Sequence, residues 1–170
     1  MTATRIELRH RIELPLPVAA AFPLFTPKGE EAWAPGWAPH YLHPADGEIR
    51  EGMVFRTDHD DETTLWGCVV YRPQAHHVRY ARVTPASRFG FVDIVCRRLA
   101  DDRTEVAVGY DYTALTPEGE RLLARLDEPC FAAMIDGWRD EITAALTLAG
   151  RAIRPGSRAP RDPRRVAPAR

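Results

Sequence analysis

The chain has 170 residues, about the size of one globular domain, and its composition of 45% hydrophobic and 28% charged residues excludes a wholly disordered protein. Its formal charge of −1 is uneven, because the last 20 residues hold seven arginines and one aspartate. Positions 1–150 therefore carry a net charge of about −7, which argues against nucleic-acid binding by this part, since phosphate contacts need clustered basic side chains.

The N-terminal third predicts one strand, two short helices and an irregular segment. Residues 6–14 alternate apolar and charged side chains, which indicates a half-buried strand that ends at Pro15. A short helix is expected over residues 18–25, and Thr26 with Pro27 has the N-cap chemistry that begins a second one. Residues 33–44 combine prolines with Trp and Tyr, which predicts an irregular segment packed on the rest of the protein.

Five strand-like runs follow, and short polar turns separate them. This pattern indicates an antiparallel meander in which one face is apolar and aromatic while the other is mostly exposed to water. The runs are Gly52–Thr57, Thr63–Tyr71, His77–Thr84, Arg88–Leu99 and Thr104–Leu115.

The last predicted element is a long helix. Thr116-Pro117 repeats the N-cap pattern, and the helix continues to Gly150 with a kink or restart at Pro129. Its second half has an apolar stripe at helical spacing. The stripe comprises Phe131, Met134, Ile135, Trp138, Ile142, Ala145 and Leu146. We therefore expect one folded domain over 1–150 and a disordered tail rich in Arg and Pro over 151–170.

This order of elements resembles the helix-grip superfamily called SRPBCC or START-like, which includes the Bet v 1 pollen allergens. The resemblance covers residues 5–149, and residues 25–30, 33–44 and 52–55 resemble a bacterial branch of unassigned function. It implies an α+β fold in which a curved antiparallel sheet of six or seven strands wraps around the long C-terminal helix, with two short helices after the first strand. It also implies a cavity between sheet and helix for a small apolar ligand.

Aromatic side chains are the candidates for the lining of that cavity, because they give a ligand apolar contact and keep polar tips. The predicted ligand is a hydrophobic or aromatic molecule, lipid-like or polyketide-like. The predicted ligand-binding residues are Trp33, Trp37, Phe55, Trp66, Tyr80, Tyr110, Tyr112, Met134 and Trp138.

Two other functions stay open. One is an enzyme of the polyketide cyclase, aromatase or dehydratase kind, for which His43, Asp46, Tyr110 and Tyr112 are the candidate proton-transfer residues. The other is a protein-interaction module like the superfamily's chaperone activators, with a patch near the Trp-Pro segment. The sequence favours a binding protein over an enzyme.

No cofactor or metal is expected. No phosphate-binding loop, dinucleotide fingerprint or nucleophile elbow is present, and the three cysteines, Cys68, Cys96 and Cys130, have no zinc-binding spacing. Prolines break the helix that would align His40 with His43 as a metal pair. Because no signal segment or long apolar run is found, we expect a cytoplasmic protein without membrane insertion. A homodimer is compatible with the sequence, although no pattern requires one.

Overall fold

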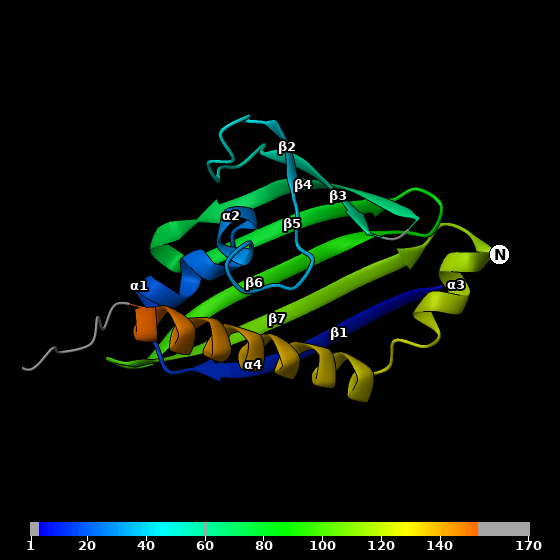
Figure 1. Cartoon of the computed structure of the whole chain (residues 1–170). Helices are drawn as coiled ribbons and strands as arrows, with labels where there is room; N and C mark the ends of the chain where they lie inside the picture. Colours follow the sequence, from blue (N-terminus) through cyan, green and yellow to red (C-terminus); the bar gives the residue numbers. More distant parts are fainter. Residues whose placement is uncertain (1–3, 60, 153–170) are drawn as a thin grey trace, which may run out of the picture.

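A seven-stranded antiparallel sheet and a long C-terminal helix form the body of the protein (Figure 1). The computed structural model describes residues 4–59 and 61–152. The spatial order of the strands is β1-β7-β6-β5-β4-β3-β2, so every strand after β1 lies beside its neighbour in the chain. The strands are β1 (Arg5–Leu14), β2 (His40–His43), β3 (Val54–His59), β4 (Glu62–Arg72), β5 (His77–Thr84), β6 (Arg88–Ala100) and β7 (Arg103–Ala114).

The helices lie on the concave side of this sheet or at its ends (Figure 1). The predicted strand, pair of short helices, meander and C-terminal helix are all confirmed. The helix expected over residues 18–25 divides after Ala21 into an α-helical turn and a 3-10 turn that contains Pro23. The helical elements are α1 (Val18–Ala21), η1 (Phe22–Phe25), α2 (Pro27–Glu30), η2 (Pro73–Ala75), α3 (Pro117–Leu123) and α4 (Glu128–Ala152).

One strand was not predicted. β2 occupies the end of the Trp-Pro segment and pairs with β3 at the sheet edge, opposite the edge at which β1 lies. The predicted boundary at residue 150 falls within α4, which ends at Ala152. The predicted tail beyond Ala152 lies outside the described residues.

Helix α4 begins where the sequence predicts a restart. The Asp127 carboxylate accepts a hydrogen bond from the backbone N–H of Cys130 at 2.9 Å, which caps the first turn, and Pro129 follows within that turn. Phe131, Ile135 and Ile142 are buried where α4 packs along β1. Across the same contact, His10 Nε2 lies 3.1 Å from Asp136 Oδ1. Among the described residues, no helix is both long and apolar enough to cross a membrane.

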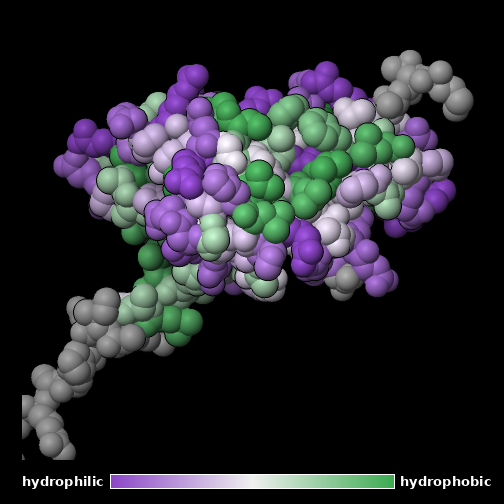
Figure 2. Space-filling view, turned by 90° about the horizontal axis from the view of Figure 1, so that it is seen from above, coloured by the Kyte–Doolittle hydropathy of each residue, from purple (hydrophilic) through white to green (hydrophobic). Residues whose placement is uncertain are grey.

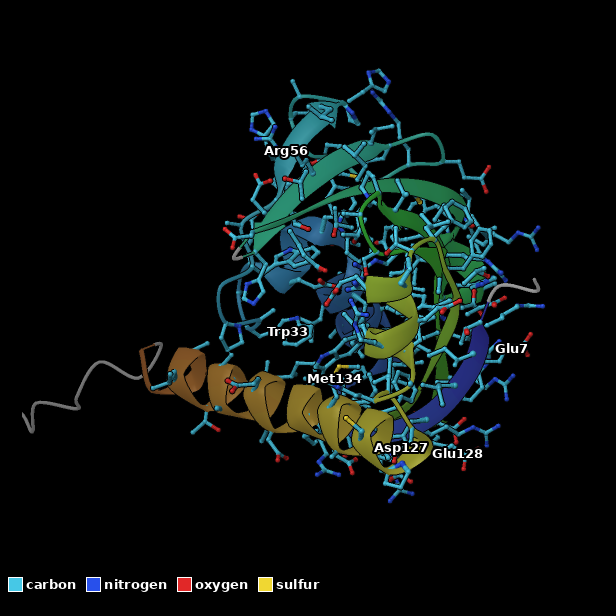
Figure 3. The ribbon with its side chains drawn as sticks, turned by 90° about the vertical axis from the view of Figure 1, so that its right-hand side faces the viewer. Glu7, Trp33, Arg56, Asp127, Glu128 and Met134 are labelled. Atoms are coloured by element: carbon cyan, nitrogen blue, oxygen red, sulfur yellow. The ribbon has the colours of Figure 1, made fainter. Side chains whose placement is uncertain are left out.

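Strand alternation separates an inner face from an outer face. Figure 3 shows Trp33 on the inner side, between sheet and α4, while Glu7 and Arg56 point outward. The outer face retains some apolar side chains, such as Val54 and Leu65, and Figure 2 shows apolar surface in patches among hydrophilic residues. The inner face holds the aromatic core that was predicted.

Candidate functional site

Helix α2 and the turn after it place four site residues, Pro27, Glu30, Trp33 and Ala34, against the inner face of the sheet. Thr26 caps α2, because its hydroxyl accepts a hydrogen bond from Gly29 N at 3.0 Å and donates to Pro23 O at 2.8 Å. Gly29 is required here, since a Cβ atom at this position would lie 2.0 Å from the Pro23 carbonyl oxygen. The carbonyl of Glu30 then accepts hydrogen bonds from Trp33 N and Ala34 N, at 3.1 and 2.8 Å. This turn brings Glu30 and Trp33 to the same side.

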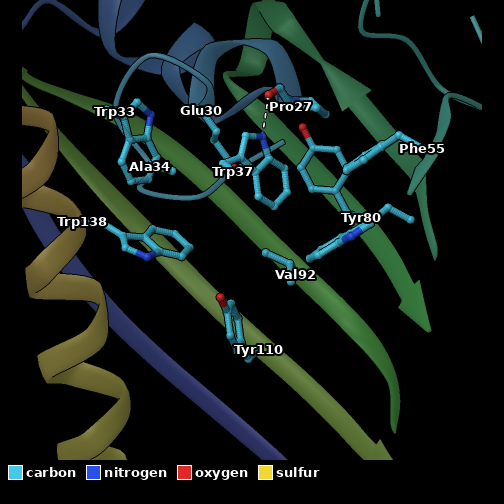
Figure 4. A pocket seen from close by; sticks show the side chains of 11 residues that line it. Pro27, Glu30, Trp33, Ala34, Trp37, Phe55, Tyr80, Val92, Tyr110 and Trp138 are labelled. Atoms are coloured by element: carbon cyan, nitrogen blue, oxygen red, sulfur yellow. Dashed lines mark hydrogen bonds between the residues drawn. The ribbon is translucent and has the colours of Figure 1, made fainter. Parts of the chain in front are cut away.

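Two tryptophans of the Trp-Pro segment are anchored through their indole nitrogens. Trp33 Nε1 donates to the carbonyl oxygen of Leu24 at 2.8 Å, and Trp37 Nε1 donates to that of Pro27 at 2.7 Å (Figure 4). Each of these bonds pairs the indole N–H, which is the polar group of the ring, with a backbone carbonyl. The apolar faces of the two rings are therefore free to form a wall.

A cavity of about 130 Å³ lies between these side chains, the sheet and α4 (Figure 4). We call it the tryptophan pocket, because all four tryptophans of the chain line it. Its lining is otherwise apolar or aromatic, with one carboxyl group. The lining residues are Pro27, Glu30, Trp33, Ala34, Trp37, Phe55, Trp66, Tyr80, Val92, Tyr110 and Trp138.

Ring contacts hold the walls of the pocket in place. Phe55 and Trp66 stack with centroids 5.6 Å apart, and Trp37 packs edge-on against both of them. On the α4 side, Trp138 lies 5.8 Å from Trp33 between ring centroids. Contacts of this kind each add about 0.5–1.5 kcal/mol beyond area burial, so the walls are well ordered before any ligand arrives.

Glu30 is the acid of the pocket. Burial among apolar side chains raises the pKa of its carboxyl from 4.5 to about 8, because the charged form loses its hydration. Within residues 4–59 and 61–152, no side chain or backbone group forms a hydrogen bond with this carboxyl. Near neutral pH Glu30 therefore carries a proton that it can donate into the cavity.

Two tyrosines supply the other polar groups of the pocket. The Tyr80 hydroxyl donates to the Phe25 carbonyl oxygen at 3.0 Å, so it is committed to the backbone. The Tyr110 hydroxyl points into the space between Trp138 and Val92 (Figure 4). Burial raises the pKa of both groups well above their ordinary value, and Tyr112 adds to this effect at Tyr110. Both phenols therefore stay protonated and act as hydrogen-bond donors.

Seven of the nine predicted ligand-binding residues line the tryptophan pocket, and two do not. Met134 lies on the exposed side of α4 with 37% of its surface accessible, because the helix turns it away from the cavity. Tyr112 is fully buried behind Tyr110, with ring centroids 4.8 Å apart, and its hydroxyl accepts a hydrogen bond from Arg82 Nη1 at 3.2 Å. The predicted residues that line the pocket are Trp33, Trp37, Phe55, Trp66, Tyr80, Tyr110 and Trp138.

The candidate catalytic residues are not brought together. His43 and Asp46 are exposed at the edge formed by β2 and the turn after it, and neither lines the pocket. Only Tyr110 of the four predicted residues reaches the cavity. Glu30, which was not predicted as a site residue, lies there instead. Its spacing of three, four and seven residues from Trp33, Ala34 and Trp37 is the sequence signal that could have found it.

Comparison with known proteins depends on structure alone. No family model matches the sequence, and no curated protein matches it either. Norcoclaurine synthase from Thalictrum flavum, solved with dopamine and hydroxybenzaldehyde, superposes with a TM-score of 0.61 at 11% identity, over 84% of this chain and 89% of that chain. The ZhuI aromatase/cyclase from Streptomyces sp. R1128 gives a TM-score of 0.54 at 15% identity, over 88% and 89%.

The chain has the helix-grip fold. An uncharacterised protein from Rhizobium leguminosarum adds a third similar structure, with a TM-score of 0.54 at 15% identity over 72% of this chain and 88% of that chain. At such identities the likeness extends to the Bet v 1-like architecture. The chemistry of the site has to be argued from this chain's own residues.

Proposed function

We propose that this helix-grip protein binds a small aromatic molecule in the tryptophan pocket. The observation that carries the proposal is a cavity of about 130 Å³ whose walls contain every tryptophan of the chain. A dry, apolar cavity of about 150 Å³ is known to hold benzene, so the volume suits one aromatic ring. Ligand pockets for larger molecules measure roughly 300–1,000 Å³, which favours the aromatic member of the predicted ligand classes over a lipid.

The ligands of one similar structure support this size class. Norcoclaurine synthase was solved with dopamine and hydroxybenzaldehyde, which are small aromatic compounds. The pocket offers such a ligand apolar walls, the Tyr110 hydroxyl and the protonated Glu30 carboxyl.

Tryptophan fluorescence tests the proposal directly, because the chain's four tryptophans all border the cavity. Titration with toluene or phenol should give a saturable change in emission. Val92→Phe should weaken this binding at least about tenfold, since the added ring fills the cavity from β6. Val95→Phe on the opposite face of β6 is the matched control and should bind as the parent protein does.

Two results would contradict the proposal. One is the absence of saturable binding for either compound. The other is equal binding by the Val92→Phe and Val95→Phe variants, once both show a folded protein by circular dichroism. Ala34→Phe blocks the same cavity from the loop and replaces Val92→Phe if that variant does not fold.

A second candidate, an enzyme that transfers protons, is favoured by the Glu30 carboxyl. Beside a ligand carbonyl, the ionised form of a carboxyl with a pKa of about 8 can take the proton from the adjacent carbon and its neutral form can return one, while the neighbouring phenol donates a hydrogen bond to the carbonyl oxygen. Incubation with 1-phenylpropan-2-one in deuterated buffer should then exchange the benzylic protons faster than buffer alone, as measured by NMR. Glu30→Gln should remove this acceleration while toluene still binds. Exchange at the buffer rate would contradict the enzyme candidate and leave the binding proposal intact.

The interaction-module alternative receives little support from the Trp-Pro segment. Trp33 is buried, Trp37 is partly buried, and both indole nitrogens are bonded to backbone. A docking patch would instead present such rings to solvent.

A further inference from the structure

Beside the tryptophan pocket, the inner face of the sheet carries a positively charged side chain among its aromatic residues. A row of four paired positions crosses it from β4 to β7: Trp66, Arg82, Gly90 and Tyr112. The Arg82 guanidinium carbon lies 4.8 Å from the Trp66 ring centre and 5.3 Å from that of Tyr112. Tyr112 leans over Gly90, where a Cβ atom would lie 2.3 Å from its ring. An arginine thus lies on the concave face, between two aromatic rings.

The partners of Arg82 are all neutral. Its Nη2 donates to the hydroxyls of Thr64 and Thr84 at 3.2 and 2.9 Å, and its Nη1 donates to the Tyr112 hydroxyl. Within the described residues no carboxylate pairs with Arg82, and its buried Nε–H has no hydrogen-bond acceptor. Arg82 is a partly buried cation without a counter-charge among the described residues, so an anion placed beside it is favoured.

A second arginine adds to the positive charge. Arg88 follows on the inner face of β6, with its side chain 11% exposed. Its Nη1 donates to Ser87 at 2.9 Å and pairs with Glu62 at 3.3 Å, while its buried Nε–H also lacks an acceptor. Burial lowers the pKa of Arg88, and the charge of Arg82 lowers it further, so the two guanidinium groups repel each other.

These arginines border a hollow of about 250 Å³ that adjoins the tryptophan pocket. We call it the arginine hollow. Ala34, Trp37 and Trp66 line both cavities, so the hollow and the pocket lie side by side and share these side chains as walls. His59, Asp58 and Glu62 also border the hollow. Asp58 is occupied by Arg56 and Thr63, and Glu62 by Arg88.

We infer that the arginine hollow binds the carboxylate of an aromatic acid whose ring occupies the tryptophan pocket. This inference depends on the proposed function, because the ring site is the tryptophan pocket itself. The guanidinium groups of Arg82 and Arg88 both border the hollow, and their hydrogen bonds to a carboxylate would be charge-assisted, which makes them about twice as strong as neutral ones. The ligand class is therefore an aryl-alkyl carboxylic acid, in which a short chain links the ring to the acid.

Matched pairs of probes separate the two sites. Phenylacetate, 3-phenylpropionate and 4-phenylbutyrate vary the length of the linker, and their primary amides have the same shape without the charge. We expect the best acid to bind about tenfold or more tighter than its amide at low ionic strength, as measured by calorimetry and tryptophan fluorescence. Sodium sulfate should compete with the acids and leave the amides unaffected.

Charge-deletion variants test the residues. Arg82→Met should reduce the affinity for the acid to that for the amide, while the amide affinity changes by less than about twofold. Arg82→Lys should recover part of the preference because it keeps the charge, and Arg88→Met provides an independent loss if Arg82→Met does not fold. Arg79→Met is the matched control, since Arg79 lies on the outer face of the same strand, 4.5 Å above the Phe91 ring.

The outcomes separate the two proposals. Equal binding of acids and amides by the parent protein overturns the arginine site but supports the tryptophan pocket. An acid preference that Arg79→Met reduces as much as Arg82→Met also overturns it, because general surface charge then explains the effect. If neither acids nor amides bind, the proposed function fails together with this inference.

Discussion

The two ends of the inner sheet face differ in how their polar atoms are satisfied. At the tryptophan pocket, the indole nitrogens of Trp33, Trp37 and Trp66 and the Tyr80 hydroxyl have partners 2.7–3.0 Å away, and the Glu30 carboxyl, which has no hydrogen bond among the described residues, can become neutral. At the arginine hollow, the buried Nε–H groups of Arg82 and Arg88 have no hydrogen-bond acceptor among the described residues, and neither group can become neutral near neutral pH. Packing therefore completes most of the first end, whereas the second keeps positive charge that the proposed carboxylate would neutralise.

The largest expected effect tests whether α4 is fixed to the apolar end. Phe131 is buried on α4 with its ring 4.9 Å from that of Tyr110. Phe131→Ala should lower the free energy of unfolding by about 3–5 kcal/mol, because it leaves a cavity under the helix. Urea denaturation measures this loss. The control is Met134→Ala, which removes an exposed side chain of the same helix and should cost less than about 1 kcal/mol. Similar losses in both variants would contradict the packing.

The next largest expected effect is the dependence of folding stability on pH. The pKa of Glu30 is raised to about 8 in the folded protein, whereas an unfolded carboxyl titrates near 4.5. Between these values the folded state holds the extra proton, so stability is full below about pH 4.5 and falls as pH rises toward 8. The slope from this group reaches at most about 1.4 kcal/mol per pH unit.

Replacement of Glu30 by Gln should flatten that slope. Thermal denaturation of Glu30→Gln and of the parent protein should agree near pH 4.5 and diverge toward pH 9, where the variant is the more stable. The control is Glu120→Gln, which makes the same replacement at an exposed position of α3 outside the pocket. Parallel profiles for Glu30→Gln and the parent would show that Glu30 is not buried as described.

A smaller effect compares two identical helix caps. Thr26 and Thr116 each accept a hydrogen bond from the glycine three residues later, at 3.0 and 3.1 Å. Replacing either by Ala should cost about 1 kcal/mol of stability. Only Thr26→Ala should also weaken toluene binding, because α2 positions Glu30 and Trp33 at the pocket. Equal effects of the two variants on toluene binding would show that the α2 cap does not position the pocket residues.

The smallest expected effect tests how the charge of Glu62 influences anion binding in the arginine hollow. Glu62 is the acid that pairs with Arg88 and is partly exposed, with 43% of its side chain accessible. Glu62→Gln should increase the affinity for an aryl-alkyl acid about twofold to threefold, since it removes a competing negative charge from a partly screened position. The affinity for the amides should stay the same. Calorimetry at low ionic strength measures both, and a decrease in acid affinity would oppose the assigned role.

Part of the candidate site could be predicted because it depends on alternation within single strands. Trp66, Tyr80 and Tyr110 lie on the inner face where the period-2 pattern places them. Arg82 and Arg88 obey the same pattern, yet charged residues are rarely expected inside, so they were not predicted there. Met134 has helical spacing to the buried stripe but lies at its edge, where 37% of its surface is exposed.

The sequence by itself determined the antiparallel sheet, the restart of the C-terminal helix at Pro129 and the capped turn at Thr26. These features depend on residues that are close together in the chain, through side-chain alternation, fixed proline geometry and N-cap hydrogen bonds. Only the tertiary structure decided that Glu30 lies among the tryptophans and that His43 and Asp46 do not. Burial decides which titratable groups have shifted pKa values, and burial arises from contacts between segments far apart in the sequence.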